Sequence, residues 1–177
     1  MQTFLRRLYL VRFVFAVAWA ALLWPVATTP GPLLTTLLVV YPLFDAGAVL
    51  WQLRNDDGLP GSHTSQRINV AVSILVAVAL GWASTVSIAA ALVVWGVWAV
   101  GAGIPQLLTA LRNRRTGGQV PQMLSGGISV LAGLSFLAMG LRGADSIAMV
   151  GGYATVGGVF FLISAIRLSV LLRKPTA

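Results

Sequence analysis

The sequence contains no cysteine and no glutamate, and only one histidine, among its 177 residues. The absence of cysteine excludes disulfides, thiol catalysis, iron–sulfur clusters and cysteine-based zinc sites. His63 is the single histidine of the chain. Because one histidine cannot build a metal site, we expect neither a metal nor a cofactor. No carboxylate pair lies within an apolar segment, and no nucleophile stands with a candidate base. We therefore expect a protein that is not an enzyme.

Charge is also scarce, and most of it is positive. Charged residues make up 9% of the chain, with 12 Lys and Arg against 4 acidic residues, whereas 58% of the residues are hydrophobic. Such a composition is typical of an integral membrane protein. The basic residues fall in loops and tails, as the positive-inside rule requires, so we expect the lipid bilayer rather than nucleic acid as partner. A homo-oligomer or a complex with another membrane protein is also compatible with this composition.

Apolar stretches separated by turns and basic loops predict an all-α integral membrane protein with six transmembrane helices. The predicted spans cover about residues 9–27, 33–53, 68–82, a fourth that follows a turn at 83–86 and ends near 111, 122–140, and 146–172. We interpret the first span as an uncleaved helix rather than a signal peptide. Ser84 or Thr85 is the expected N-cap of the fourth span. The short third span suggests a helix with little tilt or one partly within the interface.

The six spans form one transmembrane domain over residues 1–177, built as three repeated hairpins at about 9–53, 68–111 and 122–172. Loops at about 54–67 and 112–121 separate the hairpins. Arg54, Arg112 and Arg167 occupy matching places, in VLWQLRN, LLTALRN and LISAIRL. This match indicates either internal duplication or the tendency of helices to end in arginine on the positive side of a membrane.

The basic residues predict the orientation of the chain. All of them except Arg142 fall on one side of the predicted topology. Such a bias sets orientation strongly. We therefore expect a multi-pass protein of the bacterial inner membrane with both termini and the two long loops in the cytoplasm.

Asp45 is the only acidic residue with apolar sequence on both sides. A carboxylate near the bilayer centre costs roughly 2.5–3.5 kcal/mol, so it needs a partner, a proton or water. In an antiparallel hairpin that turns near Pro30, Asp45 lies one helical turn deeper than Arg12, an offset of about 4.5 Å that an arginine side chain can span. Three readings stay open: a pair with Arg12, a pair with Arg167, or a protonated Asp45 while Arg12 snorkels to the headgroups.

Proline predicts helix kinks at two positions. Pro42 lies one turn before Asp45 and leaves the carbonyl of Leu38 without its helical donor, and Pro105 interrupts the fourth span. An ion pair at Asp45 can be a structural lock between two helices, whereas a kink beside a charge also occurs at the binding sites of transporters.

Small residues recur about every seven positions in the fifth and sixth spans. This spacing predicts close helix–helix packing, because helices in lipid associate through small faces. The residues expected at these contacts are Gly126, Gly127, Gly133, Gly151 and Gly158. Such packing would leave little pore, and the polar residues in or near the spans do not obviously line one path. These residues are Asn69, Ser73, Gln106, Ser125, Ser129, Thr155 and Ser164.

The third hairpin, QMLSGGISVLAGLSFLAMG followed by GGYATVGGVFFLISAIRL, resembles the HdeD-like family of bacterial membrane proteins. The resemblance implies a six-span inner-membrane protein without a catalytic motif, with a part in membrane or acid stress. Our first hypothesis is therefore a non-enzymatic protein of this type that acts by structural or partner-binding means. The alternative is a small transporter or channel in which Asp45 responds to protons or cations.

Overall fold

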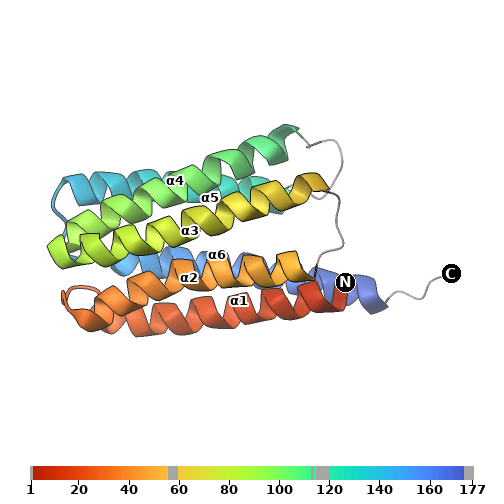
Figure 1. Cartoon of the computed structure of the whole chain (residues 1–177), viewed down its shortest axis with the longest axis horizontal. Coiled ribbons are helices and arrows are strands. Elements are labelled where there is room, and N and C mark those ends of the chain that lie inside the picture. The colour runs from red at the N-terminus through yellow and green to blue at the C-terminus, as the bar shows by residue number, and fades with distance from the viewer. Residues whose placement is uncertain (1, 56–59, 113, 115–119, 174–177) are drawn as a thin grey trace.

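The computed structural model describes residues 2–55, 60–112, 114 and 120–173, and they form a bundle of six long helices (Figure 1). Each helix is long and apolar enough to cross a membrane, and the described part of the chain contains no strand. The predicted all-α fold with six membrane-spanning helices is therefore confirmed. The helices are α1 (Gln2–Leu23), which a short 3₁₀ helix η1 (Trp24–Val26) extends, α2 (Pro32–Arg54), α3 (Pro60–Val86), α4 (Ile88–Arg112), α5 (Val120–Leu141) and α6 (Ala148–Arg173).

Successive helices run in opposite directions, so the bundle has two chemically different ends (Figure 1). At the arginine end, α1, α3 and α5 begin and α2, α4 and α6 end, with Arg6, Arg7, Arg54 and Arg112 near these helix ends. At the turn end, the short connections join α1 to α2, α3 to α4 and α5 to α6. Gly143 in the last of these turns has φ of 75°, a left-handed conformation that favours glycine.

Helix α3 is longer than the sequence predicted. The loop expected at 54–67 is wrong over its second part, because α3 begins at Pro60. Proline suits the first turn of a helix, where its missing N–H has no helical acceptor. The residues that follow Pro60 are polar and therefore predicted a loop, but in the structure they form the first turns of α3, before its apolar segment. Residues 56–59, and most of the second predicted loop, lie outside the described residues.

The connection between α3 and α4 is also shorter than predicted. The helix α3 continues through the turn expected at 83–86, and only Ser87 separates it from α4. Ser87 Oγ accepts a hydrogen bond of 3.0 Å from the N–H of Ala90, so Ser87 is the N-cap. Ser84 and Thr85, the predicted caps, instead donate their hydroxyls to carbonyls within α3.

The helix pairs that pack most extensively are α4 with α5, α1 with α6, and α2 with α3. The backbones of helices joined by the short turns approach each other less closely, and α1 and α2 meet mainly through large side chains such as Phe15 and Phe44. The strongest packing therefore does not follow the three predicted hairpins. Their repetition stays a prediction from the sequence.

Glycines form a close seam between α4 and α5. A Cβ atom on Gly133 would lie 2.8 Å from the carbonyl oxygen of Gly96, and one on Gly126 would lie 2.8 Å from the backbone nitrogen of Leu107. Gly140 continues the seam, where a Cβ atom would lie 2.7 Å from the oxygen of Ala89. Because even a methyl group would push the backbones apart, glycine is required along this seam.

The other predicted packing glycines differ among themselves. A Cβ atom on Gly151 would lie 2.9 Å from the indole nitrogen of Trp24, and one on Gly158 would lie 3.1 Å from the Cβ of Ala16. Gly127 meets nothing within 4 Å, so its predicted packing role is wrong. Its neighbour Gly126 faces α4, and the next residue of a helix points about 100° away.

Both internal prolines lie within continuous helices. Pro42 is buried in α2 and Pro105 is exposed in α4. Pro42 has no N–H and so interrupts the backbone hydrogen bonds of α2. Near this interruption, Trp19 Nε1 donates a hydrogen bond of 2.7 Å to the carbonyl of Leu37. The kinks at these two prolines stay predictions.

Candidate functional site

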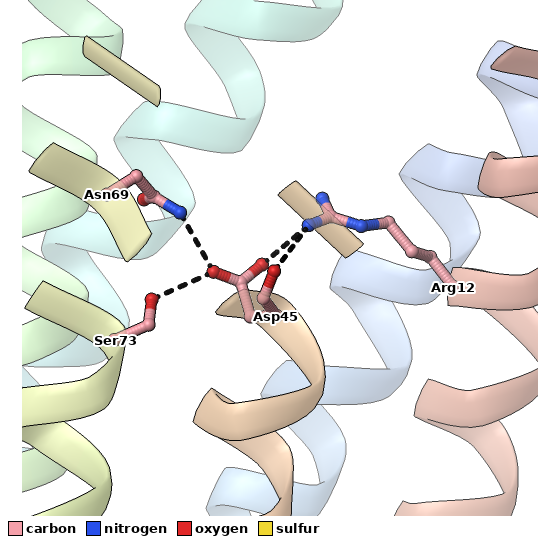
Figure 2. Close-up of polar contacts among 4 residues, drawn as sticks. All are labelled: Arg12, Asp45, Asn69 and Ser73. Carbon is pink, nitrogen blue, oxygen red and sulfur yellow. Dashed lines mark hydrogen bonds and ion pairs between the residues drawn. The ribbon is translucent and has the colours of Figure 1, made fainter. Parts of the chain in front are cut away.

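Arg12 on α1 and Asp45 on α2 lie in contact inside the bundle (Figure 2). Arg12 Nη2 lies 2.8 Å from Asp45 Oδ1 and 3.4 Å from the Asp45 carbonyl oxygen. Of the three arrangements open from the sequence, the structure has the pair between these two residues. Arg167 is exposed on α6 and forms no ion pair with Asp45.

The second carboxylate oxygen of Asp45 binds side chains of α3 (Figure 2). Asn69 Nδ2 and Ser73 Oγ each donate a hydrogen bond of 3.0 Å to Asp45 Oδ2. The sequence alone did not identify these two residues as partners of Asp45. The available signal was their spacing of four, which places both on one face of an apolar helix.

The guanidinium of Arg12 also contacts an aromatic ring. Arg12 Cζ lies 4.9 Å from the ring centroid of Phe161 on α6, a distance typical of a cation–π interaction. Both bonds from Arg12 to Asp45 leave from Nη2, and the buried Nε has no partner. The pair therefore lacks the two-pronged geometry of the strongest arginine–carboxylate contacts.

A cavity of about 350 Å³ adjoins the ion pair, and every one of the six helices contributes to its wall. Its polar lining includes Asn69, Gln106, Ser125 and Ser129. These four polar residues therefore share one cavity, which the sequence did not predict, whereas Ser73, Thr155 and Ser164 are not part of its lining. The complete lining is Arg12, Tyr41, Asp45, Asn69, Trp98, Ala99, Ala102, Gln106, Ser125, Ile128, Ser129, Tyr153, Val156, Gly157, Phe160 and Phe161.

Aromatic rings close the cavity toward the turn end. Tyr41 and Trp98 line the cavity, and the buried Trp19 and Trp95 pack behind them. The ring centroids of Trp19 and Tyr41 lie 4.6 Å apart, and those of Trp95 and Trp98 lie 5.4 Å apart. Since these residues lie on the turn side of Arg12 and Gln106 along their helices, packed aromatic rings separate the cavity from the turn end of the bundle.

The wall of the cavity combines one anion, one cation, hydroxyls, amides and aromatic rings. In the ranges that the structure describes, no group of three or more His, Cys, Asp or Glu side chains could hold a metal ion. Arg12 and Asp45 are 13% and 25% exposed, so both remain accessible from the cavity. This combination suits the binding of a small polar or charged molecule.

No family model matches the chain, and no curated protein or solved structure is detectably similar to it. The fold and the site define the class of protein, which is a multi-pass membrane protein of six helices with a polar cavity near its centre. The resemblance to the HdeD-like family stays a prediction from the sequence.

Proposed function

We propose that this protein is a small transporter that binds its ligand in the cavity beside Arg12 and Asp45. The observation that carries the proposal is a cavity with walls from all six helices and an ion pair in its wall. Charged residues within membrane spans are costly, and they commonly mark substrate or ion pathways. The proposal develops the transporter alternative that Asp45 suggested in the sequence.

The closed aromatic side of the cavity favours alternating access over an open channel. Arg12 and Asp45 join α1 to α2, two helices that otherwise meet through aromatic rings such as Phe15 and Phe44 and through the hydrogen bond of Trp19 to Leu37. A proton or a cation that reaches Asp45 competes with Arg12 for the carboxylate. Loss of the pair then removes the charged contact between the two helices in the cavity wall, which makes Asp45 the responsive group.

The proposed location is the bacterial inner membrane with both termini in the cytoplasm. The arginine end carries most of the basic residues, and the positive-inside rule places such an end on the cytoplasmic side. In this orientation the aromatic rings face the outer half of the membrane, and the proposed route into the cavity is from the cytoplasmic side.

Gly157 provides a direct test of the cavity. Gly157 lines the cavity, Gly152 lies elsewhere on α6, and a Cβ atom at either position meets nothing within 4 Å. Gly157→Leu should fill the cavity, whereas Gly152→Leu is the matched control. The assay is solid-supported membrane electrophysiology on proteoliposomes, with monovalent cations and small organic amines applied across pH steps.

We expect a ligand-dependent current in the wild type and in Gly152→Leu, and a loss of at least about tenfold in Gly157→Leu, equivalent to about 1.4 kcal/mol of binding. Asp45→Asn should abolish the dependence on pH or cation. Equal currents from the two leucine variants would exclude the cavity as the path.

A structural role is the second candidate, and the bonding of Asp45 favours it. The carboxylate accepts hydrogen bonds from side chains on both α1 and α3, as a helix lock would. The protein would then be non-enzymatic and act in membrane or acid stress through its structure or a partner. In that case Asp45→Asn lowers stability, and no variant changes any current.

A further inference from the structure

A second hollow lies between the arginine-end halves of α3 and α4. Its volume is about 650 Å³, and it shares Asn69, Trp98, Ala102 and Gln106 with the central cavity. The two helices meet at Ser87 at the turn end and contact each other far less than α4 contacts α5 (Figure 1). The hollow is therefore a groove on the side of the bundle that shares a wall with the central cavity.

The lining of this groove changes from polar to apolar with depth. Ser65 and Thr109 lie nearest the arginine end, whereas Val72, Val76 and Val97 lie deeper along the same two helices. Val97 is 59% exposed, so the groove opens on the outer surface that faces lipid. This order matches a bilayer lipid, which has a polar headgroup at the interface and an acyl chain below it.

Positive charge marks the polar mouth of the groove. Arg112 follows Thr109 by three residues, so it continues the same face of α4 beyond the lining. Arg112 is exposed and forms no ion pair with a described residue. Basic residues between helices near the membrane surface attract anionic headgroups.

We propose that the groove between α3 and α4 binds one acyl chain of an anionic membrane phospholipid, with the lipid phosphate at Arg112. The bound chain lies against Trp98 and Ala102, which also line the central cavity. The site depends on the groove and its charge, and it does not require that the protein transports anything.

Native mass spectrometry of the full chain tests this site with phosphatidylglycerol and phosphatidylcholine of identical acyl chains. Gly101 lines the groove and Gly127 lines neither hollow, and a Cβ atom at either position meets nothing within 4 Å. Gly101→Leu should therefore fill the groove, with Gly127→Leu as the matched control. We expect Gly101→Leu to lower phosphatidylglycerol binding about tenfold, the effect of losing the burial of one to two methylene groups, and Gly127→Leu to leave it unchanged.

Arg112→Gln tests the contribution of the lipid headgroup separately from that of the acyl chain. It should lower the preference for phosphatidylglycerol over phosphatidylcholine about fivefold, because one basic residue near the membrane surface contributes that much. Binding of phosphatidylcholine should change much less, because its choline group offsets the charge of its phosphate. Equal binding of the two lipids to the wild type, or unchanged binding to Gly101→Leu, would overturn the proposal. So would a dimer that Gly101→Leu dissociates, since a second copy of the chain would then occupy the groove.

Discussion

The two halves of the bundle are filled in different ways. The half at the turn end holds one large buried cluster that includes Trp19, Leu38, Leu80, Trp95 and Phe136. In the half at the arginine end, the second buried cluster is Ala46, Val49 and Val70, and the cavity and the groove extend from the middle of the bundle into this half. Packing therefore closes one half of the membrane span, and the polar chemistry lies in the other.

Buried polar atoms without a partner follow the same division. Among the described side chains these atoms are Arg6 Nε, Arg12 Nε, Gln66 Oε1 and Trp95 Nε1, and the first three lie in the arginine-end half. Buried polar groups normally have a partner in the protein or in ordered water. The half at the arginine end thus holds polar groups that can form hydrogen bonds with water or a ligand. The half at the turn end, which is filled by the large buried cluster, supplies stability.

The largest effect should come from a new cavity in the packed half. Trp95 is fully buried, so Trp95→Ala should lower the free energy of unfolding by about 3–5 kcal/mol. Phe160 already lines the central cavity, so Phe160→Ala should cost less than half as much. Unfolding in detergent with denaturant measures both. Equal losses would mean that the two halves do not differ in packing.

The next effect concerns the ion pair that links α1 and α2. Arg12→Ala should cost about 2 kcal/mol, because it strands a partly exposed carboxylate, whereas fully buried pairs cost ~3–5 kcal/mol. Asp45→Ala should cost a similar amount. The double variant should lose less than the sum of the two, with a coupling energy of at least about 1 kcal/mol. Additive losses would show that the pair contributes nothing to stability.

The glycine seam between α4 and α5 runs through both halves, so substitutions along it should lower stability to a similar extent in each half. Gly140→Ala near the turn end and Gly126→Ala near the arginine end should each cost about 1–3 kcal/mol, because the added methyl group meets backbone. Gly127→Ala should instead stabilise the protein by about 0.5–1 kcal/mol, since alanine favours helix and the site is open. A loss at Gly140 alone would confine the seam to the packed half.

The sequence predicted the features that depend on length and local spacing. Six apolar segments are long enough to span a bilayer, and each became a helix. The contact of Arg12 with Asp45 was one of three arrangements left open by the sequence, and the turn near Pro30 with the rise of an α-helix placed the two residues within reach. The spacing of seven between Gly126 and Gly133 placed both on one helix face.

The features that depend on helix rotation and on helix neighbours could not be predicted. Asn69, Gln106 and Ser125 come from three different helices, and nothing in one sequence says that they face a common space. The polar first turns of α3 carry no apolar periodicity, so they read as a loop. Ser87 was missed as a cap because Ser84 and Thr85 are equally good candidates by residue type.

The smallest effect on stability, and the sharpest contrast between the halves, should come from thiol labelling. The chain has no cysteine, so a single introduced thiol reports on its own position. Ser125 lines the cavity, whereas Ser84 is buried in α3 near the turn end. Each serine-to-cysteine change alters one atom, and we expect stability to change by less than about 1 kcal/mol.

An impermeant methanethiosulfonate reagent should modify Ser125→Cys only from the side that holds the arginine end, because the aromatic rings close the cavity on the other side. Ser84→Cys should not react from that side. The same labelling in vesicles of known orientation shows which membrane face holds the arginine end. Reaction from the cytoplasmic face agrees with the positive-inside rule. If Ser125→Cys reacts equally from both sides, the aromatic cluster does not close the cavity, and a channel replaces the alternating-access transporter as the better proposal.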